Sequence, residues 1–88
     1  MEFEWDEAKR ASNLEKHGLD FEHADLVLSG PTITLRGNRA DEERFIAVGL
    51  LEGEVVAMVY AMRGEVVRVI SLRRARDGER RKHQALHG

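Results

Sequence analysis

The residues between Val66 and His83 carry the groups most capable of chemistry in this 88-residue chain. The stretch opens with β-branched and apolar residues, which predicts a strand, and it then becomes strongly basic. Arg68 interrupts the apolar run, and we place it on the side of the strand that also carries Val66, Ile70 and Leu72. Guanidinium groups bind phosphate oxygens in pairs and stay charged, so this pattern is suited to holding a phosphodiester.

Three further groups follow at helical spacing. Glu79, Arg80 and His83 lie three and four residues apart, so they would share one helix face. An acid and an imidazole beside a guanidinium are suited to moving a proton next to a bound phosphate. More arginines lie where the strand ends: Arg73, Arg74 and Arg76. The alternative is a final strand and a solvated, charged last helix, in which Glu79 is a first-turn acid favoured by the helix dipole.

Two other candidate sites have competing interpretations. His83 and His87 have the helical spacing of zinc ligands, but the chain has no cysteine and no evident third ligand, so we expect no metal and no cofactor. Trp5 could stack on a base, but an early tryptophan in a small domain is more typical of a core anchor.

Composition and charge restrict the class of protein. The chain is long enough for one domain, residues 1–88, with a modest core; 42% of its residues are hydrophobic and 34% are charged. The net charge of −2 hides an asymmetry, because residues 60–88 hold eight Lys/Arg against three acids. A basic end favours an anionic partner such as RNA. The absence of cysteine and of a long apolar run fits a cytoplasmic protein without a membrane partner.

The elements that must position these groups follow from the apolar pattern. We expect a short strand at residues 3–5, a helix at 7–17 capped by Asp6 and ended by Gly18, and a second helix at about 21–28. Ala8, Ala11 and Leu14 should form the buried stripe of the first helix. A polar loop is predicted at 37–43. Strands at 32–36, 44–51, 54–62 and 66–73, with turns at 52–53 and 63–64, predict an antiparallel sheet of about four strands. A short C-terminal helix, near 78–87, completes an α+β fold.

Taken together, these residues resemble the BrnT family of toxins. Four segments carry the resemblance, in order and with compatible gaps: Glu4-Trp5-Asp6-x-x-Lys9-x-x-x-Asn13-x-x-Lys16-His17-Gly18, Phe21-Glu22-x-Ala24, Glu43-Arg44-Phe45-x-x-x-Gly49, and Arg68-x-Ile70-Ser71-x-Arg73-Arg74-Ala75-x-x-x-Glu79-Arg80. The resemblance implies a RelE-like fold and the activity of a ribonuclease toxin from a type II toxin–antitoxin pair. It also implies an antitoxin of the BrnA type, which has a ribbon-helix-helix part. Only this part of the toxin–antitoxin pair would contact operator DNA.

The resemblance also assigns candidate site residues. Carried across by position, they are Lys9, Lys16, His17, Arg68, Arg73, Glu79 and Arg80. The family often has a tyrosine where this chain has His83, and a threonine cap before the last helix, where we expect Asp77 to be the cap. Lys16 and His17 have a second interpretation as last-turn cations that favour the helix dipole.

Metal-free cleavage by a ribose 2′-hydroxyl requires proton transfer and cations around the phosphate. We assign the catalytic roles to Arg68, Glu79, Arg80 and His83, with His17 as a further candidate for proton transfer. RNA binding is assigned to Lys9, Lys16, His17, Arg73 and Arg74. Such an enzyme would arrest translation. The alternative is a non-catalytic nucleic-acid or protein-binding module that acts in autorepression of its own operon.

Overall fold

The computed structural model describes residues 1–37 and 42–88, and it confirms the predicted α+β class. The predicted loop at 37–43 lies largely outside the described residues. The elements follow one another as β1 (Glu2–Glu4), α1 (Glu7–His17), the 3-10 turn η1 (Phe21–His23), α2 (Ala24–Ser29), β2 (Ile33–Gly37), β3 (Arg44–Leu51), β4 (Glu54–Arg63), β5 (Val66–Arg74) and α3 (Asp77–His87). None of the helices formed by these residues has the length and apolar character that a membrane crossing requires.

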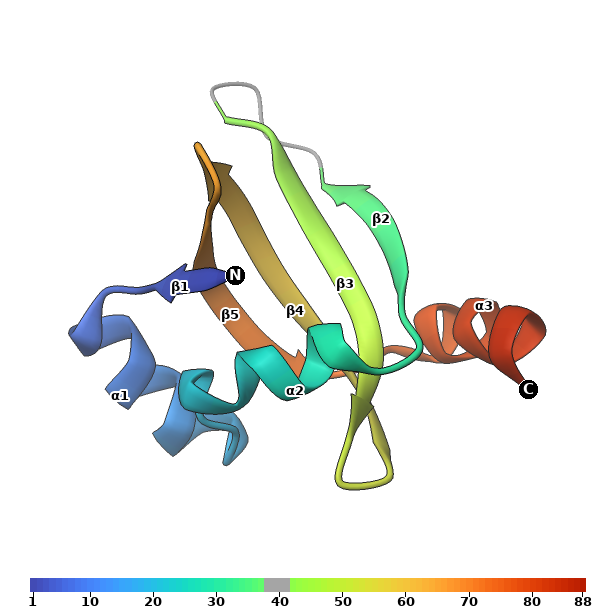
Figure 1. The fold of residues 1–88 in the computed structure, drawn as a ribbon. Coiled ribbons are helices and arrows are strands. Elements are labelled where there is room, and N and C mark those ends of the chain that lie inside the picture. The colour runs from blue at the N-terminus through green and yellow to red at the C-terminus, as the bar shows by residue number, and fades with distance from the viewer. Residues whose placement is uncertain (38–41) are drawn as a thin grey trace.

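The strands form one sheet in the order β1-β5-β4-β3-β2 (Figure 1). β2 to β5 are antiparallel, as predicted, whereas β1 lies parallel to β5 and adds a fifth strand. β4 is central, which explains its nearly continuous apolar sequence. The predicted hairpin turns are present, and at the first of them Glu52 and Gly53 both have positive φ, at 51° and 81°, as a two-residue hairpin loop requires.

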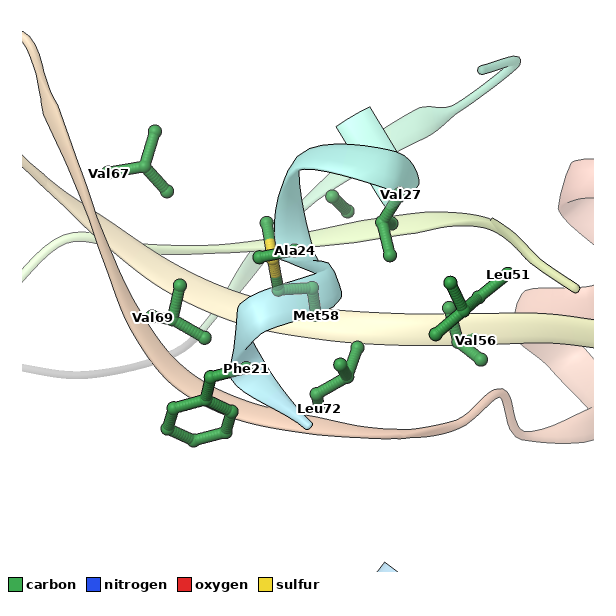
Figure 2. Packing of buried hydrophobic residues seen from close by; sticks show 10 residues of the cluster. Phe21, Ala24, Val27, Leu51, Val56, Met58, Val67, Val69 and Leu72 are labelled. Carbon is green, nitrogen blue, oxygen red and sulfur yellow. The ribbon is translucent and has the colours of Figure 1, made fainter. Parts of the chain in front are cut away.

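The main core lies between the sheet and the segment formed by η1 and α2, which crosses one sheet face (Figure 1). Side chains from this segment meet buried side chains of β3, β4 and β5 (Figure 2), and those fully enclosed include Phe21, Val27, Val56, Met58 and Leu72. The rings of Trp5 and Phe21 meet edge to face at 6.2 Å. Trp5 therefore packs against the core, which is the interpretation that its early position in a small domain favours.

The opposite sheet face, which we call the second face, carries arginines over small residues. Ala57 and Ala61 of β4 lie directly across from Arg73 and Arg68 of β5, and both alanines are buried. Side chains paired across two strands project from the same face. The two alanines therefore leave room for long arginine side chains to lie across the strand beside them.

A β-bulge in β5 overturns one predicted alignment. The partners run from Val59↔Ser71 to Tyr60↔Val69, so Ile70 is the extra residue. A bulge reverses the alternation of side chains that follow it. Leu72 therefore joins Val67 in the main core, and the prediction that Leu72 shares a side with Arg68 was wrong.

Helix α1 also buries a different residue from those expected. Ala8, Ala11 and Leu14 are exposed, and Asn13 is buried with only 7% of its surface accessible. Asn13 Nδ2 donates to the carbonyls of Leu72 (2.8 Å) and Leu19 (3.0 Å), and Leu72 N–H donates to Asn13 Oδ1 (3.1 Å). β1 pairs with β5 only as far as Arg68. The amide of Asn13 therefore acts as a short strand substitute on the edge of β5 beyond the bulge.

Helix α3 starts at Asp77, one residue earlier than predicted, and it follows an extended Arg76. Asp77 is thus the first helical residue and not the cap. Arg76 N–H donates to Glu79 Oε1 at 2.8 Å, so the side chain of Glu79 satisfies a backbone donor ahead of the helix. The second predicted helix also differs, because residues 21–23 form a 3-10 turn before α2 begins.

Candidate nucleic-acid interface

A groove with a volume of about 360 Å³ lies between α1 and the bulged part of β5, and we call it the α1 groove. Three of the predicted RNA-binding residues, Lys9, Lys16 and His17, line it together with Ile70 and Ser71. Other lining residues come from the start and middle of α1: Asp6, Ala8, Ser12 and Asn13. The bulge and the hydrogen bonds of Asn13 fix the position of α1 beside β5, so the same contacts that hold the helix also shape the groove.

The charges in this groove favour an anion. Among the described residues, no carboxylate oxygen lies within 4.0 Å of the amino group of Lys9 or Lys16. The acid that lines the groove, Asp6, already accepts from the backbone N–H groups of Ala8 and Lys9 as the cap of α1. Two lysines and one histidine therefore line a groove whose one carboxylate is held by the helix terminus.

Arg74 contacts the end of α1 from the sheet face opposite to Arg73. Its guanidinium donates to the carbonyl of His17 (2.9 Å), at the end of α1, and to Glu54 (2.8 Å). After the bulge Arg74 lies on the helix-covered face, opposite to Arg73. Its contact therefore positions His17, and the side chain is directed away from the second face.

Arg73 lies next to the groove on the second face. It is two residues beyond Ser71, which corresponds to about 7 Å along a strand. Its guanidinium forms a two-pronged pair with Glu79, with Nη1–Oε1 at 2.8 Å and Nη2–Oε2 at 3.0 Å, and both side chains are largely buried, with 16% and 11% of their surfaces exposed. The hydrogen bonds from Arg73 hold the pKa of Glu79 below its usual value, because they stabilise the charged form.

Arg68 and Arg80, the two arginines to which the sequence assigns catalytic roles, have separate partners. Arg68 pairs with Glu4 at 2.9 Å across the β1–β5 boundary. Arg80 donates to the carbonyl of Ala75 at 2.6 Å and forms an ion pair with Asp77. Each of these guanidinium groups is therefore held by its own carboxylate.

His83 attaches α3 to the sheet. It is 5% exposed, and its Nε2 lies 2.9 Å from the carbonyl of Pro31. His87 makes the equivalent contact with the carbonyl of Thr32 at 3.0 Å. Because a carbonyl only accepts, each ring must donate through Nε2. The two histidines that had zinc-ligand spacing therefore bind consecutive backbone carbonyls just before β2.

The predicted site residues thus fall into two groups at different ends of the molecule. α1 lies beside β5, whereas α3 extends from the end of β5 towards β3 and β2 (Figure 1). Lys9, Lys16 and His17 come together in the α1 groove. Arg80 and His83 lie on α3, and Arg73 with Glu79 lies between these two regions. Ser71 was not among our candidates, since its place in the groove depends on a bulge that leaves no signal in the sequence.

Comparison with known proteins identifies one family. The sequence model of a family described as "Ribonuclease toxin, BrnT, of type II toxin-antitoxin system" matches residues 5–79. The match covers α1, η1, α2, the four strands β2 to β5 and the first residues of α3. No curated protein sequence matches the chain.

Proposed function

The chain belongs to the BrnT family of ribonuclease toxins from type II toxin–antitoxin systems, and from this premise we propose that it cleaves RNA in the α1 groove. The observation that carries the proposal is the convergence of Lys9, Lys16 and His17 on one groove beside β5. Lys9 and Lys16 would bind the phosphate that is cut. Arg73, next along the second face, is already paired with Glu79, so we assign it to the support of the groove and not to a phosphate.

The reaction we propose is attack by the ribose 2′-oxygen on the adjacent phosphorus. A P–O2′ bond forms, the P–O5′ bond breaks, and the products end in a 2′,3′-cyclic phosphate and a 5′-hydroxyl. The proton of the 2′-hydroxyl must leave and the departing 5′-oxygen must gain one. Histidine is suited to both transfers because imidazole exchanges protons near neutral pH, and we assign this role to His17. The ammonium groups stabilise the charge that develops on the phosphate.

This assignment changes the roles of all four residues to which the sequence alone gave catalytic roles. Glu79 is paired with Arg73 and has a lowered pKa, so it would orient Arg73 and be a weak base. His83 and Arg80 contact backbone carbonyls, and we propose that they hold α3 in place. Arg68, on the same sheet face as Ser71, pairs with Glu4 in a partly exposed position, and we assign it to a more distant phosphate.

In the cell, the proposed consequence is arrest of translation, relieved by a BrnA-like antitoxin with a ribbon-helix-helix part. The purified chain, freed of antitoxin, should cleave RNA in the presence of a chelator. A substrate with a single 2′-deoxyribose at the cleaved position should stay intact there, because the nucleophile is missing.

Two histidine variants test the position of the site. His17→Gln should lower the cleavage rate about 10²- to 10⁴-fold, the usual contribution of proton transfer by a side chain. His23→Gln is the matched control, because His23 lies on η1 outside the α1 groove. Equal cleavage by both variants would place the chemistry elsewhere, and binding of RNA without cleavage by the parent chain would favour the non-catalytic module.

A further inference from the structure

A second cavity, which we call the α3 cavity, lies between α3 and the sheet. Its volume is about 240 Å³. Its apolar lining comes from Pro31, Leu50 and Val55, and α3 supplies the other wall through Arg80, His83, Gln84, His87 and Gly88. Leu50 is 37% exposed. A large apolar side chain therefore remains accessible to solvent at this cavity.

Three of the four polar side chains that line the α3 cavity, all except that of Gln84, are already engaged. Arg80 is held by Ala75 and Asp77, and the rings of His83 and His87 donate to backbone carbonyls. A phosphate entering the cavity would find these donors occupied. An apolar side chain would instead remove the exposed surface of Leu50 from water, which is favourable.

We propose that the α3 cavity receives a large apolar side chain of the protein antitoxin. This inference rests on the proposed neutralisation by such a partner and does not depend on where RNA is cut. A specific protein interface buries about 800 Å² on each partner, so the cavity would be an anchor point within a larger contact. Apolar anchors seated in pockets contribute a large share of binding energy at such interfaces.

The charge on α3 specifies the neighbours of this anchor. Arg76, just before α3, and Arg81 and Lys82 on the helix are exposed, whereas the acids of α3 are used internally, Glu79 by Arg73 and Asp77 by Arg80. Acidic residues of the partner segment around the inserted side chain would complement Arg76 and Arg81 and would speed association. The proposed partner segment is therefore apolar at its centre and acidic at its flanks.

The test compares two exposed leucines in the full chain. Leu50→Asp should weaken binding of the purified antitoxin from the same operon at least tenfold in calorimetry, since it places a charge in the apolar cavity. Leu26→Asp is the control, because Leu26 is 50% exposed on α2, which lies on the other side of the sheet. The Leu26→Asp variant should bind the antitoxin with an affinity within twofold of that of the parent chain. Both variants should cleave RNA as the parent does and keep its melting temperature.

Several results would overturn the inference. Binding by Leu50→Asp at the affinity of the parent chain would do so, and so would an equal loss in both variants. Loss of self-association in Leu50→Asp, with antitoxin binding intact, would show that a second copy of this chain occupies the cavity. If Leu50→Asp does not fold, Leu50→Ala should give a smaller loss of affinity in the same direction, and no loss would count against the proposal. Absence of cleavage by the parent chain would refute the proposed function alone, because binding is measured separately.

Discussion

Replacing Asn13 by alanine should destabilise the fold far more than its place on an exposed helix suggests. The side-chain amide of Asn13 makes three hydrogen bonds, two with Leu72 and one with the carbonyl of Leu19. Their loss leaves one backbone donor and two backbone acceptors without this partner, at about 1–3 kcal/mol for each that stays buried. Because water can reach part of the site, we expect a total loss of about 3 kcal/mol, a large share of the roughly 5–15 kcal/mol that stabilises a typical domain.

Thermal and urea unfolding, followed by circular dichroism, measure this loss. A change of about 3 kcal/mol corresponds to a fall in melting temperature on the order of 15 °C for a domain of this size. Asn13→Asp sharpens the test, since its carboxylate can accept from Leu72 N–H but cannot donate to either carbonyl. It should be at least as unstable as Asn13→Ala at pH 7, and it should recover part of the loss at a pH where the carboxyl is protonated.

Ser12→Ala, at the neighbouring exposed position of α1, is the control and should stay within about 0.5 kcal/mol of the parent chain. A loss below about 1 kcal/mol for Asn13→Ala would refute the argument that this amide replaces a strand on the edge of β5.

Three further predictions follow from contacts in the fold. Because Arg73 lowers the pKa of Glu79, this carboxylate stabilises the fold above its unfolded pKa, and that contribution is lost as the pH falls through the lower folded pKa. The Glu79→Gln variant should therefore be about 3 kcal/mol less stable than the parent chain at pH 7. Its stability should also depend less on acid, which urea unfolding over a series of pH values would measure. A Cβ at Gly49 would lie 2.9 Å from both the backbone of α2 and a side chain just before β2, so Gly49→Ala should lose about 1–3 kcal/mol of stability. A Cβ at Gly30 would meet nothing within 4 Å, so Gly30→Ala should melt at a temperature close to that of the parent chain. Similar melting temperatures for the two variants would contradict the close packing. His83→Ala should speed amide hydrogen exchange throughout α3 and leave α2 unchanged, and unaltered protection of α3 would mean that other contacts hold this helix.

The sequence was sufficient for the features that depend on neighbouring residues. Asp6 and Gly18 delimit α1 as predicted, since a cap needs only a side-chain oxygen or a residue that tolerates positive φ. The hairpin turns and the central place of β4 also follow from local patterns of glycine and apolar residues. The family could likewise be identified from four ordered segments, because a motif is a property of the chain itself.

What the sequence could not determine depends on contacts between distant residues. The bulge at Ile70 transfers Leu72 to the other face of β5, and no residue type marks it. The prediction that α1 buries an apolar stripe was wrong because the edge of β5 needs hydrogen-bond partners. Asn13 supplies them to Leu72, which lies 59 positions further along the chain.

The partners of the arginines and histidines also depend on contacts between distant residues. Their types predicted phosphate binding, but which carboxylate or carbonyl each one reaches is set by the packing of α1 and α3 against the sheet. The chain by itself therefore determined the elements, the family and the supply of cationic groups. Only the tertiary structure decided that Lys9, Lys16 and His17 share a groove, because that depends on where a helix meets the edge of a bulged strand.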